Sequence, residues 1–108
     1  MDKSRQLLFW TMDKKFELQD LEFEWDEKKY AVNLWKHSVK FEEAAEVFFD
    51  PEQQFGIASV EETREFVIGF SFSLNLLYTV FVERGERIRI ISARPATKEE
   101  EKIYDRSK

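Results

Sequence analysis

The pattern of apolar and polar positions changes its period along this chain of 108 residues. Residues 21–25 alternate apolar with acidic side chains, which is the pattern of a half-buried strand. Over 26–37 the apolar side chains recur at intervals of three and four, which indicates a helix with Asp26 as its N-cap. A second short helix is predicted over 41–49, because its apolar residues form one stripe and Asp50-Pro51 ends it.

Strand patterns follow the second helix. A weak strand is predicted over 54–60, and residues 64–72 alternate two sets of side chains between opposite faces. Residues 76–82 are almost continuously apolar, which favours a central strand covered on both faces. The Arg84-Gly85 pair indicates a hairpin turn into the next strand. Short loops between the last three strands predict an antiparallel meander.

The C-terminal part begins with Thr97-Lys98-Glu99-Glu100, a capping box that starts a charged helix. The order of elements therefore predicts an α+β domain over residues 21–108. It has an N-terminal strand, two helices, an antiparallel sheet of about four strands and a C-terminal helix. Residues 1–20 are predicted to be an extension, either packed on the domain as a small element or partly ordered.

The densest positive stretch is 83–94, which carries four arginines against two glutamates in a chain of net charge −5. Isoleucine and arginine alternate in it, so one side of this strand is expected to be buried and the other presented. The presented arginines suit a polyanion or an acidic partner. The alternative is that they only solvate the strand and discourage edge pairing. The acidic total counts against a strong general nucleic-acid binder.

Several classes of function are excluded by composition. There is no cysteine, and there is a single histidine, so neither a disulfide framework nor a zinc site is expected. We expect no metal and no cofactor. No apolar run reaches the length of a membrane-spanning helix, and the polar N-terminus does not match a signal peptide. A cytoplasmic protein with no membrane association is therefore expected.

A set of short motifs occurs together over about residues 21–105: Phe23-Glu24-Trp25-Asp26, Asn33, Lys36-His37, Val39-Lys40-Phe41-Glu42-Glu43-Ala44, Asp50-Pro51, 64–69, 83–94, Ala96-Thr97 and Tyr104. In this combination of motifs the chain resembles the BrnT family of toxins. The resemblance implies a RelE-like fold, metal-independent ribonuclease activity that arrests translation, and neutralisation by a BrnA-type antitoxin in a hetero-oligomer. It also implies that operator DNA is bound only through the antitoxin.

Cleaving RNA without a metal requires deprotonation of the 2′-hydroxyl, stabilisation of charge on the phosphate and protonation of the leaving oxygen. Arginine can bind phosphate through a two-pronged fork, and histidine is the side-chain type that titrates near neutrality. The predicted catalytic residues are His37, Arg64, Arg87 and Arg89, the predicted RNA-phosphate ligands are Arg94 and Lys36, and the predicted supporting residues are Asn33 and Tyr104.

Each of these roles has a structural alternative. His37 is also compatible with a helix-end residue packed against the core, Tyr104 with a packing anchor, and Lys36 with a solvated surface lysine. Trp25 and Trp35 are predicted to be core residues. The leading hypothesis is a ribonuclease toxin in which Asn33 orients His37. Its rival is a catalytically silent binding module whose arginine strand docks an acidic segment of an antitoxin, and a third option is a stability domain in a larger complex.

Overall fold

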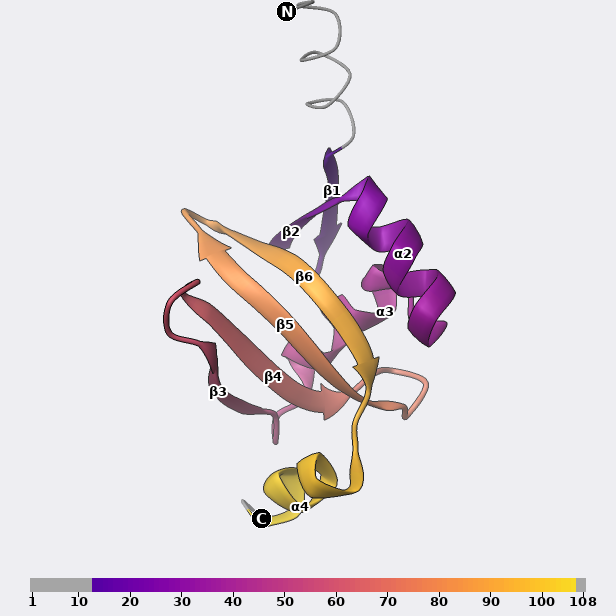
Figure 1. Cartoon of the computed structure of the whole chain (residues 1–108), viewed down its shortest axis with the longest axis vertical. Coiled ribbons are helices and arrows are strands. Elements are labelled where there is room, and N and C mark those ends of the chain that lie inside the picture. The colour runs from indigo at the N-terminus through magenta and orange to yellow at the C-terminus, as the bar shows by residue number, and fades with distance from the viewer. Residues whose placement is uncertain (1–12, 107–108) are drawn as a thin grey trace, which may run out of the picture.

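Six strands form one mixed sheet in a computed structural model that describes residues 13–106 (Figure 1). The strand order is β1-β2-β6-β5-β4-β3, and only the pairing of β2 with β6 is parallel. The strands are β1 (Asp13–Leu18), β2 (Leu21–Asp26), β3 (Gln54–Ser59), β4 (Arg64–Phe70), β5 (Leu76–Arg84) and β6 (Arg87–Pro95).

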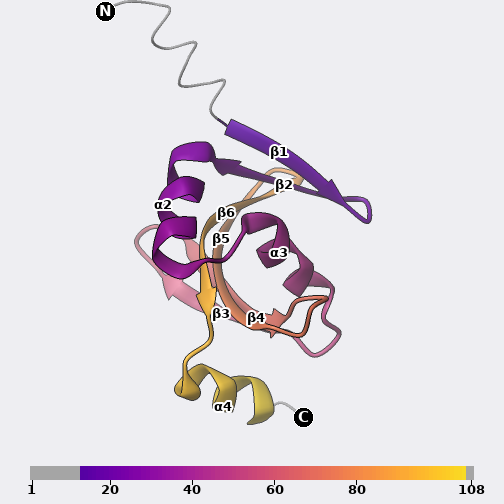
Figure 2. The same ribbon diagram turned by 90° about the vertical axis from the view of Figure 1, so that its right-hand side faces the viewer.

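Helices cover one face of the sheet and its lower end. The short α3 (Phe41–Glu46) and the 3-10 turn η1 (Val47–Phe49) lie behind the sheet in Figure 1, and α2 (Glu27–His37) runs beside β6. The C-terminal α4 (Lys98–Arg106) lies beyond the end of β6, as Figure 2 also shows. None of the helices within residues 13–106 is long and apolar enough to cross a membrane.

The α+β class and the order of elements are confirmed, but the sheet is larger than the predicted four strands. The N-terminal strand does not stand apart. It joins the same sheet as β2, parallel to β6, and part of the predicted extension adds β1 beside it. Period-2 alternation predicts that a strand exists but does not say which strand it pairs with, and parallel partners are distant in sequence. The first twelve residues of the extension lie outside the described residues.

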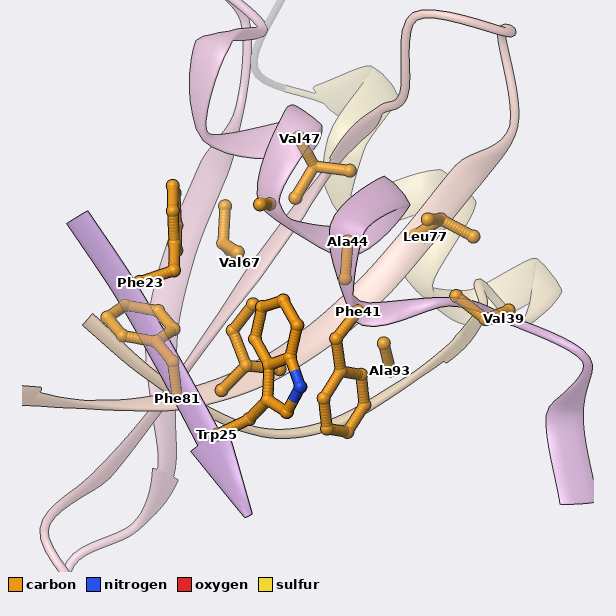
Figure 3. Packing of buried hydrophobic residues seen from close by; sticks show 12 residues of the cluster. Phe23, Trp25, Val39, Phe41, Ala44, Val47, Val67, Leu77, Phe81 and Ala93 are labelled. Carbon is orange, nitrogen blue, oxygen red and sulfur yellow. The ribbon is translucent and has the colours of Figure 1, made fainter. Parts of the chain in front are cut away.

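The core lies between the helix-covered face of the sheet and α3. Phe23 and Trp25 of β2 point into it together with Phe41 of α3 and Phe81 of β5 (Figure 3). The Trp25 and Phe41 rings meet edge to face at 5.7 Å. Trp25 is thus a core residue, as predicted. The prediction for Trp35 is wrong, because its side chain is 85% exposed on the outward side of α2.

A bulge in β6 decides which way the arginines face. Phe81 of β5 pairs with Ile90, but the preceding Val80 pairs with Ser92, so Ile91 is an extra residue in the ladder. The bulge shifts the alternation by one position, and both Ile90 and Ala93 are therefore buried on the core side. As a result Arg94 lies on the same outward face as Arg87 and Arg89, which simple alternation of an unbroken strand would not give.

Asn33 attaches α2 to the edge of the sheet. The parallel pairing of β2 with β6 ends at Arg89, and beyond it α2 takes the place of a neighbouring strand. The buried Asn33 amide donates to the carbonyl oxygen of Ala93 (2.8 Å) and accepts from its backbone N–H (3.0 Å). It also donates to the carbonyl oxygen of Val39 (3.3 Å). One side chain thus satisfies the backbone groups that a strand partner would otherwise bind.

The capping box of α4 is confirmed. The Thr97 backbone N–H donates to Oε1 of Glu100 (2.9 Å), and the Glu100 N–H donates to Oγ1 of Thr97 (3.2 Å). The helix is held by Tyr104, which is 2% exposed and packs edge-on against Phe70. The Tyr104 hydroxyl donates to Oδ2 of Asp50 (2.7 Å), and burial together with this contact raises the pKa of the phenol.

Candidate functional site

The arginines at the start of β6 are neutralised by carboxylates of the neighbouring strands. Arg89 binds Glu24 of β2 at 2.6 Å and Asp13 of β1 at 3.3 Å, and its side chain is only 18% exposed. Burial opposes the charge of Arg89, but the two carboxylates outweigh it and raise the pKa of the guanidinium. Arg87 lies 3.6 Å from Glu22 and is more exposed. The predicted positive strip is therefore a row of internal ion pairs.

Arg64 joins this end of the sheet from β4. It lies one residue before the Glu65–Phe81 pair and forms an ion pair with Glu62 at 3.0 Å. Two strand spacings separate β4 from β6, which places Arg64 about 10 Å from the Arg89 position. Three of the four predicted catalytic residues are thus brought to one end of the outward face, and His37 is not among them.

Arg94 lies toward the opposite end of β6, where Glu100 and Tyr78 hold it. Its two terminal nitrogens bind the two oxygens of Glu100 at 2.7 and 2.8 Å, and its guanidinium carbon lies 4.3 Å from the centre of the Tyr78 ring. Hydrogen bonds to Glu100 raise the pKa of Arg94 against the effect of burial. Burial works to raise the pKa of Glu100, but the hydrogen bonds from Arg94 and from Thr97 prevail and lower it.

A cavity of about 460 Å³ between α2 and β6, called the α2 cavity below, is lined by three further predicted site residues, Asn33, Lys36 and His37. Its floor includes Ile91 and Ser92, which lie between Arg89 and Arg94 in β6. Neither Lys29 nor Lys36 has a carboxylate partner within residues 13–106, in contrast to the arginines of β6. The residues that line the cavity are Asp26, Lys28, Lys29, Val32, Asn33, Lys36, His37, Ile91 and Ser92.

His37 lies where this cavity meets a second one. It is the last residue of α2, and it also lines a cavity of about 710 Å³ toward α4. That second cavity contains the carboxylates of Glu43, Glu101 and Asp105, so an imidazole here has cationic neighbours on one side and anionic ones on the other. Asn33 is one turn earlier, but its amide hydrogen bonds go to backbone groups of Val39 and Ala93. It therefore acts on His37 only by fixing the position of α2.

Several residues that shape these surfaces were not foreseen from the sequence. Glu22 and Glu24 were seen only as the polar side of a strand, although their spacing of two matches that of Arg87 and Arg89, with which they pair in register. That matching spacing was the available signal. Tyr78 has no sequence signal for its contact with Arg94, because the contact depends on the bulge in β6. Tyr104 lies on α4, away from the α2 cavity, and contacts Asp50 and Phe70.

Comparison with known proteins identifies the class to which this fold and surface belong. A family model described as the ribonuclease toxin BrnT of type II toxin–antitoxin systems matches residues 25–100. The chain therefore belongs to the BrnT family of ribonuclease toxins. The type II organisation of this family implies an antitoxin as partner.

A solved structure supports the fold. The crystal structure of the Brucella abortus ribonuclease toxin BrnT is similar, with a TM-score of 0.57 and 23% sequence identity. The alignment covers 68% of this chain and 94% of the Brucella chain. No curated protein matches the chain. At this level of identity the likeness establishes the shared fold, and residue roles must be argued from the geometry of this chain.

Proposed function

We propose that the chain is a ribonuclease that cleaves RNA by metal-independent attack of the 2′-hydroxyl on the adjacent phosphate and so inhibits translation in the cytoplasm. The observation that carries this proposal is the α2 cavity. This cavity is lined by His37 and by Lys29 and Lys36, and neither lysine forms an ion pair with a carboxylate within residues 13–106. Cationic groups without internal partners are the ones available to a phosphate.

The proposed roles follow from position. His37 transfers the proton, because it lies at the rim of the cavity where a scissile phosphate would lie beside Lys36. Lys36 and Lys29 bind the phosphate as point charges. Arg94 extends the path along the outward face and is already held in one orientation by Glu100. Arg64, Arg87 and Arg89 lie further along the same face and contribute only where RNA phosphates replace their carboxylate partners. Tyr104 supports the site by fixing α4.

The second candidate function is a silent binding module, and the ion pairs of the arginine strand favour it. Each arginine that was predicted to act on RNA has a carboxylate within 4.0 Å. Such arginines can serve the sheet alone and leave the surface to a protein partner. The two functions differ in one respect that can be measured, namely whether the isolated chain cuts RNA.

The deciding experiment incubates the purified chain with RNA in the presence of a chelator. We expect cleavage that leaves a 2′,3′-cyclic phosphate, a strong loss of rate in His37→Gln and Lys36→Ala, and an unchanged rate in the matched control Lys102→Ala on α4. Translation of a reporter in a cell-free extract is expected to stop with the wild-type chain and with Lys102→Ala, and to continue with His37→Gln and Lys36→Ala. Absence of cleavage at several salt concentrations, with partner binding intact, would establish the silent module instead.

The arginine variants need a folding control. Arg87 is half-exposed and loosely paired, so Arg87→Ala is expected to fold normally and to report on RNA directly. Arg89→Ala leaves Glu24 without its closest partner in a mostly buried position, so a loss of stability is expected before any loss of chemistry. Thermal unfolding measured on both variants separates the two effects. Equal thermal stability of the two variants would contradict the structural role given to the Arg89–Glu24 ion pair.

The partner is proposed to be a BrnA-like antitoxin that forms a hetero-oligomer with this chain and alone contacts operator DNA. The proposal is supported by membership of a type II family and by the acidic net charge of −5, which disfavours direct binding of duplex DNA. In a gel-shift assay, operator DNA is expected to bind the complex and not the free chain. Binding of operator DNA by the free chain at moderate salt would refute the proposal that the antitoxin alone contacts DNA.

A further inference from the structure

The free edge of β3 is unlike a protected sheet edge. At the other edge, β1 presents Asp13, Lys14, Lys15 and Glu17 within six residues. Residues 54–60, by contrast, contain no charged residue and no proline. Natural sheets usually protect their edges with charge or proline, because an exposed apolar edge pairs readily with other chains. The β3–β4 ladder has one register shift, between Ile57 and Ser59, and the edge residues before it carry neither charge nor proline. Such an edge is suited to receive a strand.

Apolar side chains are exposed along this edge. Phe55 is 51% exposed, Ile57 is 70% exposed, and Val60 just beyond the strand is also exposed. Phe55 and Ile57 pair with Val67 and Glu65 of β4, so they lie on the helix-covered face but beyond the helices. Phe55 and Ile57 lie two residues apart on the same face of β3, so they form one exposed apolar strip along the edge.

A groove continues from this edge across the sheet. It has a volume of about 280 Å³ and is lined by Phe48, Phe55, Phe81, Ile88 and two carboxylates, Glu65 and Glu83. Phe55 meets the rings of Phe48 at 6.3 Å and Phe81 at 6.0 Å, so the floor is aromatic. The apolar floor suits an inserted side chain, and the two carboxylates suit a basic residue next to it.

The chemistry of the groove selects the class of occupant. No lysine or arginine lines it, and Glu65 and Glu83 repel phosphate, so RNA does not fit here. A second copy of this chain would bring the same two carboxylates to the contact, which like-charge repulsion disfavours. A segment of another protein that carries apolar and basic residues avoids both kinds of charge repulsion and fits the apolar floor.

We propose that the antitoxin docks by adding an extended segment to the free edge of β3, with apolar side chains in the Phe55–Phe81 groove and basic side chains beside Glu65 and Glu83. This proposal rests on the proposed function, because that function supplies the antitoxin. It places the antitoxin on the helix-covered face, whereas the α2 cavity opens beside the outward-facing part of β6. Neutralisation on this arrangement does not require the antitoxin to occupy the RNA path.

The test uses the full chain co-expressed with the protein encoded by the adjacent reading frame. Ile57→Lys places a charge on the edge at a position that is already exposed, so the fold is expected to survive. Its affinity for that protein is expected to fall about tenfold or more. Leu74→Lys in the β4–β5 loop is the matched control, with a side chain that is 77% exposed, and its affinity is expected to match the wild type.

Two further measurements define the mode of docking. Amide exchange of 54–59 is expected to slow in the complex, because an added strand binds the edge N–H groups. Combined Glu65→Lys and Glu83→Lys substitution is expected to weaken binding, most strongly at low salt. Exchange that slows only on α2, or a Trp35→Lys variant that loses binding while Ile57→Lys keeps it, would overturn the proposal. So would failure of the adjacent protein to bind the wild-type chain, or an Ile57→Lys effect confined to self-association.

The outcomes for docking and for catalysis are separable. Ile57→Lys without its partner is expected to cut RNA at the wild-type rate and to resist neutralisation. If the wild-type chain cuts no RNA but Ile57→Lys still loses the partner, the proposed function fails and the docking site stands. If RNA is cut and Ile57→Lys is neutralised normally, the docking site fails and the function stands.

Discussion

Asn33 shows how one side chain can connect two elements of this fold. Its amide oxygen and nitrogen bind the backbone N–H and C=O of Ala93, and the same nitrogen also binds Val39. These groups are buried, so they cannot exchange a lost hydrogen bond for water. The residue was predicted to support His37, and the contacts supply a mechanism for that support, since α2 carries both Lys36 and His37.

Asn33→Ala is therefore expected to destabilise the chain by about 2–3 kcal/mol, because it leaves two backbone groups of Ala93 unsatisfied. Urea unfolding followed by tryptophan fluorescence measures the change. The control is Gln54→Ala, since within residues 13–106 the hydrogen bonds of the Gln54 amide go to the neighbouring carbonyls of Glu52 and Gln53. A loss of less than about 0.5 kcal/mol is expected there. An equal loss of unfolding free energy in the two variants would refute the role of Asn33.

At the scale of elements, the connection between β6 and α4 depends on one carboxylate. Glu100 completes the capping box with Thr97 and binds Arg94 through both oxygens, so it joins the start of the helix to the end of the strand. Arg94 in turn lies over Tyr78 of β5. A surface ion pair alone contributes little, but this one is bidentate, mostly buried and shared with a helix cap.

This connection predicts a specific dependence of stability on pH. The folded state lowers the pKa of Glu100 below its unfolded value of about 4.3, so its contribution is complete above that value. The contribution is lost as pH falls through the lower, folded pKa. Glu100→Gln is therefore expected to be less stable than wild type by about 1–2 kcal/mol near pH 7, with the difference shrinking below about pH 4.

The matched control is Glu99→Gln in the same helical turn. Glu99 is highly exposed and lies 3.7 Å from Lys102, so no comparable pH dependence is expected. Thermal unfolding between pH 3 and pH 7 compares the three proteins. A constant difference between wild type and Glu100→Gln across that range would contradict the role of the ionised carboxylate.

At the scale of the whole molecule, charge is divided between neutralised and available groups. The chain has a net charge of −5, and the β6 arginines Arg87, Arg89 and Arg94 are paired with carboxylates. Lys29 and Lys36 of α2 line the cavity and form no ion pair with a carboxylate within residues 13–106, so they are available to a polyanion. An acidic chain gives little long-range attraction to RNA, so binding should depend on these few local contacts and be sensitive to salt.

The salt dependence of RNA binding tests this division. Each phosphate contact with single-stranded RNA contributes a slope of about −0.7 in log affinity against log salt. The variant with Lys29→Ala and Lys36→Ala is therefore expected to reduce the magnitude of the slope by about 1.4. RNA affinity is measured by filter binding, and all proteins carry His37→Gln so that the RNA is not cleaved during the assay. The control variant, Lys14→Ala with Lys15→Ala on β1, is expected to leave the slope unchanged. A slope that responds only to substitutions of Arg84 in β5 and Arg87 in β6 would place RNA at the hairpin end of these two strands.

The sequence by itself determined the local elements, because their signals are local. Asp26 and Thr97 cap helices where they were predicted to, and the Arg84-Gly85 turn joins β5 to β6. In that turn Gly85 has a φ of 61°, a conformation that glycine adopts at little cost. The α+β class and the membership of the BrnT family also followed from residues that are read in order along the chain.

Only the tertiary structure decided which charges are available. The arginines of β6 look like a presented strip in sequence, but their partners Asp13, Glu22 and Glu24 come from strands that are more than sixty residues away. The bulge at Ile91 turned Arg94 onto their face, and the exposure of Trp35 depended on how α2 lies against β6. Pairing between distant strands is a cooperative property of the sheet, so no local pattern encodes it.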